Sequence, residues 1–156
     1  MSLSAEAVFE AYYHRVYRLG FSLSGDASEA EDIAQEVFVA VVRGISRFRG
    51  DAEITTWLYR ITVRVAARHV AKRQRSGVRS VDLDEVSSTE QVERQAYLAS
   101  VIEAISKLSV AQRTVLSLVS IEGLSHREVA RVLGVPEGTV WSRLHAARKQ
   151  LMKQLK

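Results

Sequence analysis

The residues best suited to binding chemistry lie near the C-terminal end, in the segment GLSHREVARVLGVPEGTVWSRLHAARKQL over residues 123–151. Ser125 and Glu128 have the spacing of a capping box, in which each side chain accepts a hydrogen bond from the other residue's backbone N–H. Gly134 suits the left-handed residue that ends a helix, and Pro136 suits the first position of the next helix. The pattern therefore predicts a helix-turn-helix.

The second of these helices has two faces of different chemistry. Its apolar side chains recur at intervals of four, three and four residues, at Val140, Leu144, Ala147 and Leu151. The opposite face carries Trp141, Ser142, His145, Arg148 and Lys149. A helix of this build can enter the major groove of DNA, where polar side chains contact base edges and cations contact phosphates. An ordinary helical hairpin is the alternative, and the placement of glycine, proline and basic residues favours DNA binding.

A second candidate group lies in the segment FRGDAEITTWLYRITVRVAARHVAKRQR, residues 48–75. It combines three aromatic residues with cations spaced by four along one helical edge: Phe48, Trp57 and Tyr59, with Arg60, Arg64, Arg68 and Lys72. Such a stripe can follow a phosphate backbone, and aromatic rings can stack on an unpaired base. In the alternative interpretation, Trp57 belongs to the core and the cations only make the helix soluble.

A third group is acidic. Asp32, Gln35 and Glu36 are neighbours on one face of a helix, because residues three and four apart lie side by side. The opposite face carries the apolar stripe that we expect to be buried: Ala30, Ile33, Ala34, Val37, Phe38 and Val41. A solvated helix face is the ordinary explanation for three such residues. The alternative is a docking surface for a basic partner.

The elements that position these groups are expected to be helices. Helical periodicity predicts helices over residues 5–23, 28–42, 55–73, 92–108 and 110–121, followed by the helix-turn-helix. The stretch 76–90 lacks this periodicity and is rich in small and polar residues, which indicates a flexible linker. The predicted fold is all-α, with small helical domains at 1–75 and 91–156.

Charge and composition narrow the possible functions. The net charge is only +4, but residues 43–80 hold ten basic and two acidic residues, and residues 107–156 hold nine and three. Two basic blocks separated by acidic ones indicate two nucleic-acid contacts on one chain. The chain has no cysteine, which excludes disulfides and thiolate metal sites. Its longest apolar run is 37–42, too short to span a bilayer, so we expect a soluble, cytoplasmic protein.

Several of these motifs together resemble one family. AEDIAQEVF (30–38), RFRG (47–50), TWLYRI (56–61) and the helix-turn-helix occur in the order seen in extracytoplasmic-function sigma factors. These are two-domain initiation subunits of bacterial RNA polymerase. The resemblance implies a non-catalytic protein without cofactor or metal, whose partners are core RNA polymerase, promoter DNA and an anti-sigma factor, often membrane-anchored.

The resemblance also implies roles for individual residues. Core polymerase would bind Asp32, Gln35, Glu36 and Val39. The promoter's minus-ten element would be held by Arg47, Phe48, Arg49, Gly50, Asp51, Trp57, Arg60, Arg64 and Arg68. The minus-thirty-five element would be contacted by Ser125, Arg127, Thr139, Trp141, Ser142, Arg143, His145, Ala146, Arg148 and Lys149.

The chain departs from the residues common in the family at four positions in or next to the two DNA-binding sets. Relatives often carry a basic residue where this chain has Trp141 and Ala146, a cation at Val63 and an asparagine near Arg64. Neither Trp141 nor Ala146 can donate two hydrogen bonds to guanine, although both can pack against a thymine methyl group. These departures imply a distinct promoter preference.

Two other function classes are open to the sequence. A helix-turn-helix repressor or activator that works without polymerase explains the C-terminal half, but it leaves the acidic group and the aromatic-basic segment without a role. An enzyme is the third class. The four histidines lack metal-ligand spacing, and the chain contains no glycine-rich phosphate loop or nucleophile elbow.

Overall fold

The computed structural model describes residues 3–50, 53–76 and 88–155, and every regular element in these ranges is helical. The all-α prediction is confirmed. The elements are α1 (Ala5–Ser24), α2 (Ala27–Gly44), the short 3₁₀ turn η1 (Ile45–Arg47), α3 (Ile54–Ser76), α4 (Thr89–Ser106), α5 (Val110–Leu116), the π-helical turn η2 (Ser117–Ile121), α6 (His126–Leu133) and α7 (Glu137–Gln154).

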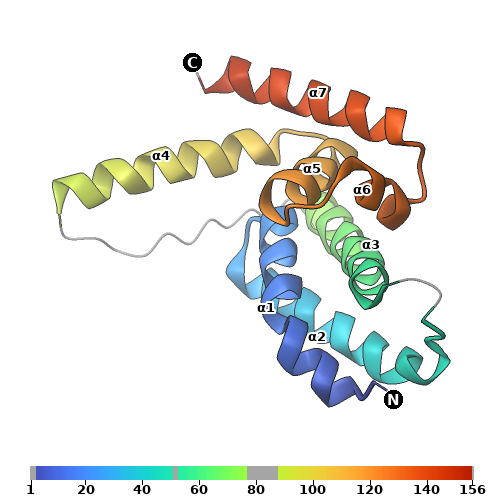
Figure 1. Cartoon of the computed structure of the whole chain (residues 1–156). Coiled ribbons are helices and arrows are strands. Elements are labelled where there is room, and N and C mark those ends of the chain that lie inside the picture. The colour runs from blue at the N-terminus through green and yellow to red at the C-terminus, as the bar shows by residue number, and fades with distance from the viewer. Residues whose placement is uncertain (1–2, 51–52, 77–87, 156) are drawn as a thin grey trace.

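The first three helices form a bundle in the N-terminal half (Figure 1). Ser4 caps α1, and Gly25 ends it with φ 72°, a left-handed conformation that favours glycine. Asp26 then accepts from Glu29 N–H at 2.8 Å and begins α2 directly. The predicted apolar stripe of α2 is fully buried: Ala30, Ile33, Ala34, Val37, Phe38 and Val41. The opposite face of α2 is therefore left for solvent or a partner.

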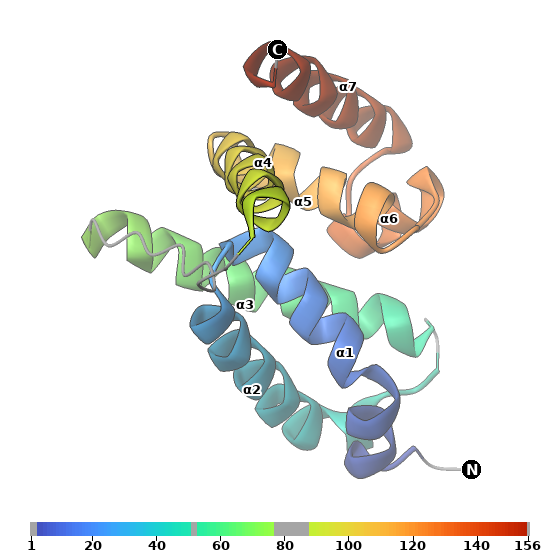
Figure 2. The same cartoon turned by 90° about the vertical axis from the view of Figure 1, so that its left-hand side faces the viewer.

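The C-terminal half is built around α5, α6 and α7, which pack closely on one another. Figure 2 shows α7 on the outer side of α5 and α6. By contrast, α4 extends sideways from the rest of the molecule, and Ala104 is its only residue that is buried. Two departures from the predicted elements are local: the helix beginning at Val110 widens into η2, and Pro136 is the N-cap of α7 rather than its first helical residue.

Polar contacts join the two halves where α1 and α3 pack on the C-terminal half. Arg18 of α1 pairs with Glu122, with Nη2 and Oε2 2.5 Å apart. Arg60 of α3 donates two hydrogen bonds, of 3.1 and 2.7 Å, to the carbonyl of Arg131 in α6. Further contacts are made by Tyr59 and Arg113 and are described below. α3 therefore contacts α6 over residues that lie 71 positions apart.

Arg113 anchors this junction from inside the molecule. It is only 4% exposed, and it donates to the carbonyls of Leu23, Ile105, Ser106 and Leu108 at 2.7–3.2 Å. A buried guanidinium needs such partners because its charge has lost the solvation of water. One side chain thereby joins the end of α1 to the turn between α4 and α5.

The predicted linker 76–90 lies mostly outside the described residues. Ser76 is the last residue of α3, and Thr89 and Glu90 are the first residues of α4. Ser88 caps α4 by accepting from Gln91 N–H at 3.3 Å. The helices therefore reach further into the predicted linker than periodicity indicated.

Candidate nucleic-acid interface

The helix-turn-helix has the local geometry that its sequence predicts. Ser125 Oγ accepts from Glu128 N–H at 3.1 Å, and Glu128 Oε1 accepts from Ser125 N–H at 3.4 Å, so the capping box is complete. Gly134 ends α6 with φ 66°. The N–H of Val135 then donates to the carbonyl of Ala130 at 3.1 Å, which fixes the turn into α7.

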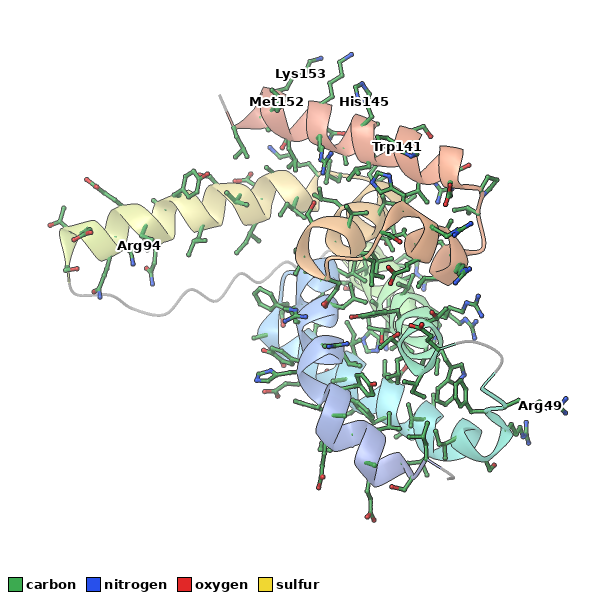
Figure 3. The ribbon with its side chains drawn as sticks, in the orientation of Figure 1. Arg49, Arg94, Trp141, His145, Met152 and Lys153 are labelled. Atoms are coloured by element: carbon green, nitrogen blue, oxygen red, sulfur yellow. The ribbon has the colours of Figure 1, made fainter. Side chains whose placement is uncertain are left out.

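One face of α7 is buried in the C-terminal core through Val140, Leu144 and Ala147. The predicted binding residues lie on the rest of the helix surface. Trp141, Ser142, His145, Arg148 and Lys149 are exposed, whereas Thr139, Arg143 and Ala146 are half-buried. Figure 3 shows His145 and Lys153 projecting outward from α7, away from α5 and α6. The helix thus offers an uncovered basic face.

The beginning of α6 lies beside the beginning of α7. Arg127 Nε is 3.9 Å from Glu137 Oε1, so one predicted binding residue already faces an acidic side chain. The imidazole of His126 packs edge-to-face on the indole of Trp141, with ring centroids 4.2 Å apart and an interplanar angle of 84°. The sequence analysis missed His126, because its proximity to Trp141 arises only when the two helices cross.

The cations along α3 are largely engaged within the chain. Arg60 bonds to the Arg131 carbonyl, and Arg68 Nη2 lies 2.9 Å from Glu36 Oε2. One turn further, Arg73 pairs with Glu29 at 2.6 Å and also donates to the carbonyl of Ser24. Arg64 is exposed. The predicted stripe exists as one helical edge, but part of it contacts α2 and α6.

The loop that follows α2 is held by an aromatic pair. Phe48 and Trp57 are half-buried, with ring centroids 5.3 Å apart. A Cβ on Gly44 would lie 3.1 Å from Cζ2 of Trp57, so the indole packs directly on the end of α2. Arg47, Arg49 and Gly50 are exposed, and Asp51 lies outside the described residues. In Figure 3, Arg49 marks the tip of this loop, at the opposite end of the molecule from α7.

The acidic face of α2 lies beside this loop and α3. Asp32, Gln35 and Glu36 are exposed, and the apolar side chain of Val39 is 49% exposed next to them. Glu36, Val39, Arg47 and Arg68 line one open groove between α2, η1 and α3. The structure therefore brings together residues that the family resemblance assigns to two different partners.

The contact between the halves shifts the ionisation of two side chains. Burial raises the pKa of the Tyr59 hydroxyl, and the nearby Glu122 carboxylate raises it further. That hydroxyl lies 3.5 Å from Glu122 Oε2, at the limit of hydrogen-bonding distance. The hydrogen bond to Glu122 likewise raises the pKa of Arg18. Both shifts favour the protonated side chains in the packed arrangement.

Comparison with known proteins places these surfaces in a family. Residues 8–76 match sigma-70 region 2, and residues 98–151 match sigma-70 region 4. The RNA polymerase sigma-H factor of Pseudomonas aeruginosa is 37% identical, over 92% of this chain and 82% of that protein. The ECF RNA polymerase sigma-E factor of Escherichia coli is 32% identical, over 90% of this chain and 80% of that protein. This chain belongs to the extracytoplasmic-function sigma factors.

The fold of this sigma factor is also found among solved structures. The sigma factor RpoE of Bartonella quintana, crystallised with the anti-sigma factor NepR, superposes with a TM-score of 0.76. The match covers 96% of this chain and 95% of that one at 23% identity. The likeness extends over both halves and supports the arrangement in Figure 1.

Two further features of the described residues bear on function. No helix among them has the length and apolar character needed to cross a membrane. Within the same residues, no group of three or more histidine or acidic side chains is arranged to hold a metal ion.

Proposed function

We propose that this sigma factor binds core RNA polymerase, directs it to a specific set of promoters and helps to open the minus-ten element. The observation that carries the proposal is the groove in which Glu36 and Val39 of α2 lie beside the basic side chains of Arg47 and Arg68, from η1 and α3. A helix-turn-helix alone would need only α6 and α7. The exposed charged groove of the N-terminal half has no role in such a protein, which favours a second binding partner.

The polymerase-binding surface is the exposed face of α2, comprising Asp32, Gln35, Glu36 and Val39. Its acidic side chains lie one and two turns before an exposed apolar one, which suits a basic helical partner whose apolar residues pack on Val39. This partner is a segment of the core enzyme.

The minus-ten surface comprises the loop after α2 and the first turns of α3. A base flipped out of the duplex would bind near Arg47, Phe48, Arg49, Gly50 and Asp51, while Trp57, Arg60, Arg64 and Arg68 hold the strand. Capture of an unpaired base offsets part of the cost of unstacking it, which makes promoter opening a binding equilibrium that needs no ATP. The protein therefore supplies binding free energy and no catalytic group, and the polymerase carries out the chemistry.

The minus-thirty-five surface is the exposed face of α7 with the start of α6. Trp141, Ser142, His145 and Ala146 would lie nearest the bases, and Arg143, Arg148 and Lys149 would lie at phosphates. Ser125, Arg127 and Thr139 border this face. The two proposed DNA surfaces are well separated, with Arg49 at the lower right and α7 across the top of Figure 3.

The proposal extends to the regulation and organisation of the chain. We assign residues 1–75 to polymerase and minus-ten binding and 91–156 to minus-thirty-five binding, with 76–90 as the connection between them. An anti-sigma factor that binds both halves would hold the protein inactive. The sigma factor RpoE of Bartonella quintana was crystallised in complex with an anti-sigma factor, NepR. The protein would act in the cytoplasm, where polymerase and promoter DNA are found.

Reconstitution with bacterial core RNA polymerase tests this function. A stable complex that starts transcripts from a genomic fragment library supports it, and the mapped start sites reveal both promoter elements. Failure to bind polymerase, with tight binding of duplex DNA by the protein alone, would instead support the repressor or activator.

Charge substitutions on α2 test the docking surface. We expect Asp32→Ala and Glu36→Arg to weaken polymerase binding, the latter by about tenfold or more, since a reversed charge then faces a basic partner. Glu93→Arg is the matched control, because Glu93 is an exposed acidic residue on α4, outside the proposed surface. Equal binding by the control and the α2 variants would contradict the assignment.

A further inference from the structure

Trp141 is the most unusual side chain on the proposed DNA-binding face. It is a large aromatic residue that is 60% exposed on the second turn of α7. The imidazole of His126 packs on its indole edge-to-face, with the ring centroids 4.2 Å apart. Aromatic pairs in this geometry attract each other through the positive edge of one ring and the negative face of the other.

The backbone of His126 is itself firmly placed. It is the first residue of α6 and directly follows Ser125, whose capping box with Glu128 is closed in both directions. Arg127, the next residue, faces Glu137 in the first turn of α7. The start of α6 therefore lies beside the start of α7, and the capping box orders the turn that carries His126 next to the indole.

We propose that His126 is a positioning residue that holds the indole of Trp141 in the orientation that reads one base pair of the minus-thirty-five element. This inference rests on the proposed role of α7 in promoter binding. The indole has a single donor and no acceptor, so it cannot make the paired hydrogen bonds that identify guanine or adenine. Its apolar ring can pack against the C5-methyl group of thymine. The base pair that it reads is therefore A·T, with the thymine methyl group facing α7.

Orientation matters more for such a contact than for a phosphate contact. A flexible cation can follow a phosphate through several rotamers, whereas an indole distinguishes a methyl group from a hydrogen only when its ring faces that position. Removing His126 frees the indole to adopt other rotamers. Base discrimination is then lost at one position while the phosphate contacts of Arg148 and Lys149 remain.

The packing itself is tested by the fluorescence of Trp141 in the full chain. Trp57→Phe leaves Trp141 as the only tryptophan, since the sequence has two. Adding His126→Ala should shift the emission to longer wavelength and lower the anisotropy, because the indole gains water contact and rotational freedom. Adding His126→Phe should restore both values. In the complementary Trp141→Phe background, His126→Ala should leave the emission of Trp57 unchanged.

The reading role is tested in holoenzyme on a promoter found by start-site mapping, with its upstream element randomised. The unsubstituted protein should favour thymine at one position by about fivefold or more, the range typical of a single base-pair contact. Trp141→Ala and His126→Ala should both reduce that preference to less than about twofold at the same position, and His126→Phe should restore it. His14→Ala, on the exposed face of α1, is the matched histidine control.

The outcomes separate this inference from the proposed function. If His126→Ala retains the full thymine preference, or leaves the emission of Trp141 unchanged, the positioning role is overturned. Uniform weakening on every sequence would also overturn it, since that result indicates a structural or phosphate role. If the unsubstituted protein starts no transcripts, the proposed function fails and the reading role fails with it, while the fluorescence still decides whether His126 holds the indole.

Discussion

The basic residues of α7 and those of α3 differ in the hydrogen bonds and ion pairs that they make within the protein. Arg148 and Lys149 of α7 are exposed and make no hydrogen bond or ion pair within the described part of the chain. On α3, Arg60 bonds to the Arg131 carbonyl of α6, and Arg68 bonds to Glu36 of α2. One proposed DNA surface is therefore open, and the other is partly covered by the protein itself.

This difference has an energetic consequence. Phosphates that bind α7 replace only water and counterions, so the contact is governed by counterion release. Arg60 already donates two of its five N–H groups to the Arg131 carbonyl, so a strand that drew its guanidinium away would loosen the contact between the halves. We therefore expect binding at the proposed minus-ten surface to favour separation of α3 from α6.

The largest expected effect comes from the residue that anchors the junction between the halves. Arg113→Ala removes a buried guanidinium and leaves four carbonyl acceptors without it. We expect the free energy of unfolding to fall by about 3 kcal/mol. Urea denaturation measures this change. Arg127→Ala is the control, because Arg127 is an exposed arginine of the same half and should cost less than about 0.5 kcal/mol. If the free energy of unfolding falls by the same amount in the two variants, the buried hydrogen bonds of Arg113 do not stabilise the protein more than an exposed arginine does.

The second effect concerns the open surface. Arg148→Ala should lower the slope of log promoter affinity against log salt concentration by about 0.9 in the holoenzyme, because one phosphate contact is lost. The free energy of unfolding should stay unchanged, since Arg148 has no partner within the described residues. Filter binding or fluorescence anisotropy over a range of salt concentrations measures the slope. An unchanged slope would place Arg148 away from the DNA.

Local features of the fold could be predicted because they follow from short stretches of sequence. The apolar stripe of α2 was predicted residue by residue, since six buried positions at helical spacing leave little ambiguity. The capping box of Ser125 and Glu128 and the left-handed Gly134 were also predicted, because each depends on residues within one or two turns. The π-helical turn η2 was not predicted, since no local residue pattern marks where a helix widens.

Features that depend on how the halves meet could not be predicted. Arg18 and Glu122 are 104 residues apart, and nothing in either helix identifies the other as its partner. Arg113 has the appearance of an ordinary surface cation in the sequence, yet it is buried, because its partners are carbonyls that only the folded chain brings together. The candidate binding residues were predicted as faces of helices. Their assignment to particular partners stays a prediction.

A smaller effect distinguishes the covered surface from the open one. Arg60→Ala should lower the free energy of unfolding by up to about 1 kcal/mol, because the two hydrogen bonds to α6 are lost at a solvent-exposed site. Arg64→Ala, one turn further along α3, should leave stability unchanged, since Arg64 is exposed and makes no such contact within the described residues. Both variants should weaken promoter opening. If the two variants have the same free energy of unfolding in urea, the hydrogen bonds of Arg60 do not stabilise the contact between the halves, and the proposed coupling is contradicted.

The smallest expected effect is the pH dependence of the same junction. Burial and the neighbouring Glu122 carboxylate raise the pKa of Tyr59, so the neutral phenol is more stable in the folded protein than in the unfolded chain. A raised pKa contributes stability that is fully present below the unfolded value of about 10 and is lost as the pH rises through the folded value. We therefore expect the free energy of unfolding to decrease above about pH 10, and the decrease should be shallower in Tyr59→Phe, which has no proton to lose there.

The comparison of these two proteins isolates Tyr59, because the other tyrosines and the lysines titrate in both. Parallel profiles would mean that the Tyr59 hydroxyl is as accessible to water in the folded protein as in the unfolded chain, which would contradict its burial beside Glu122.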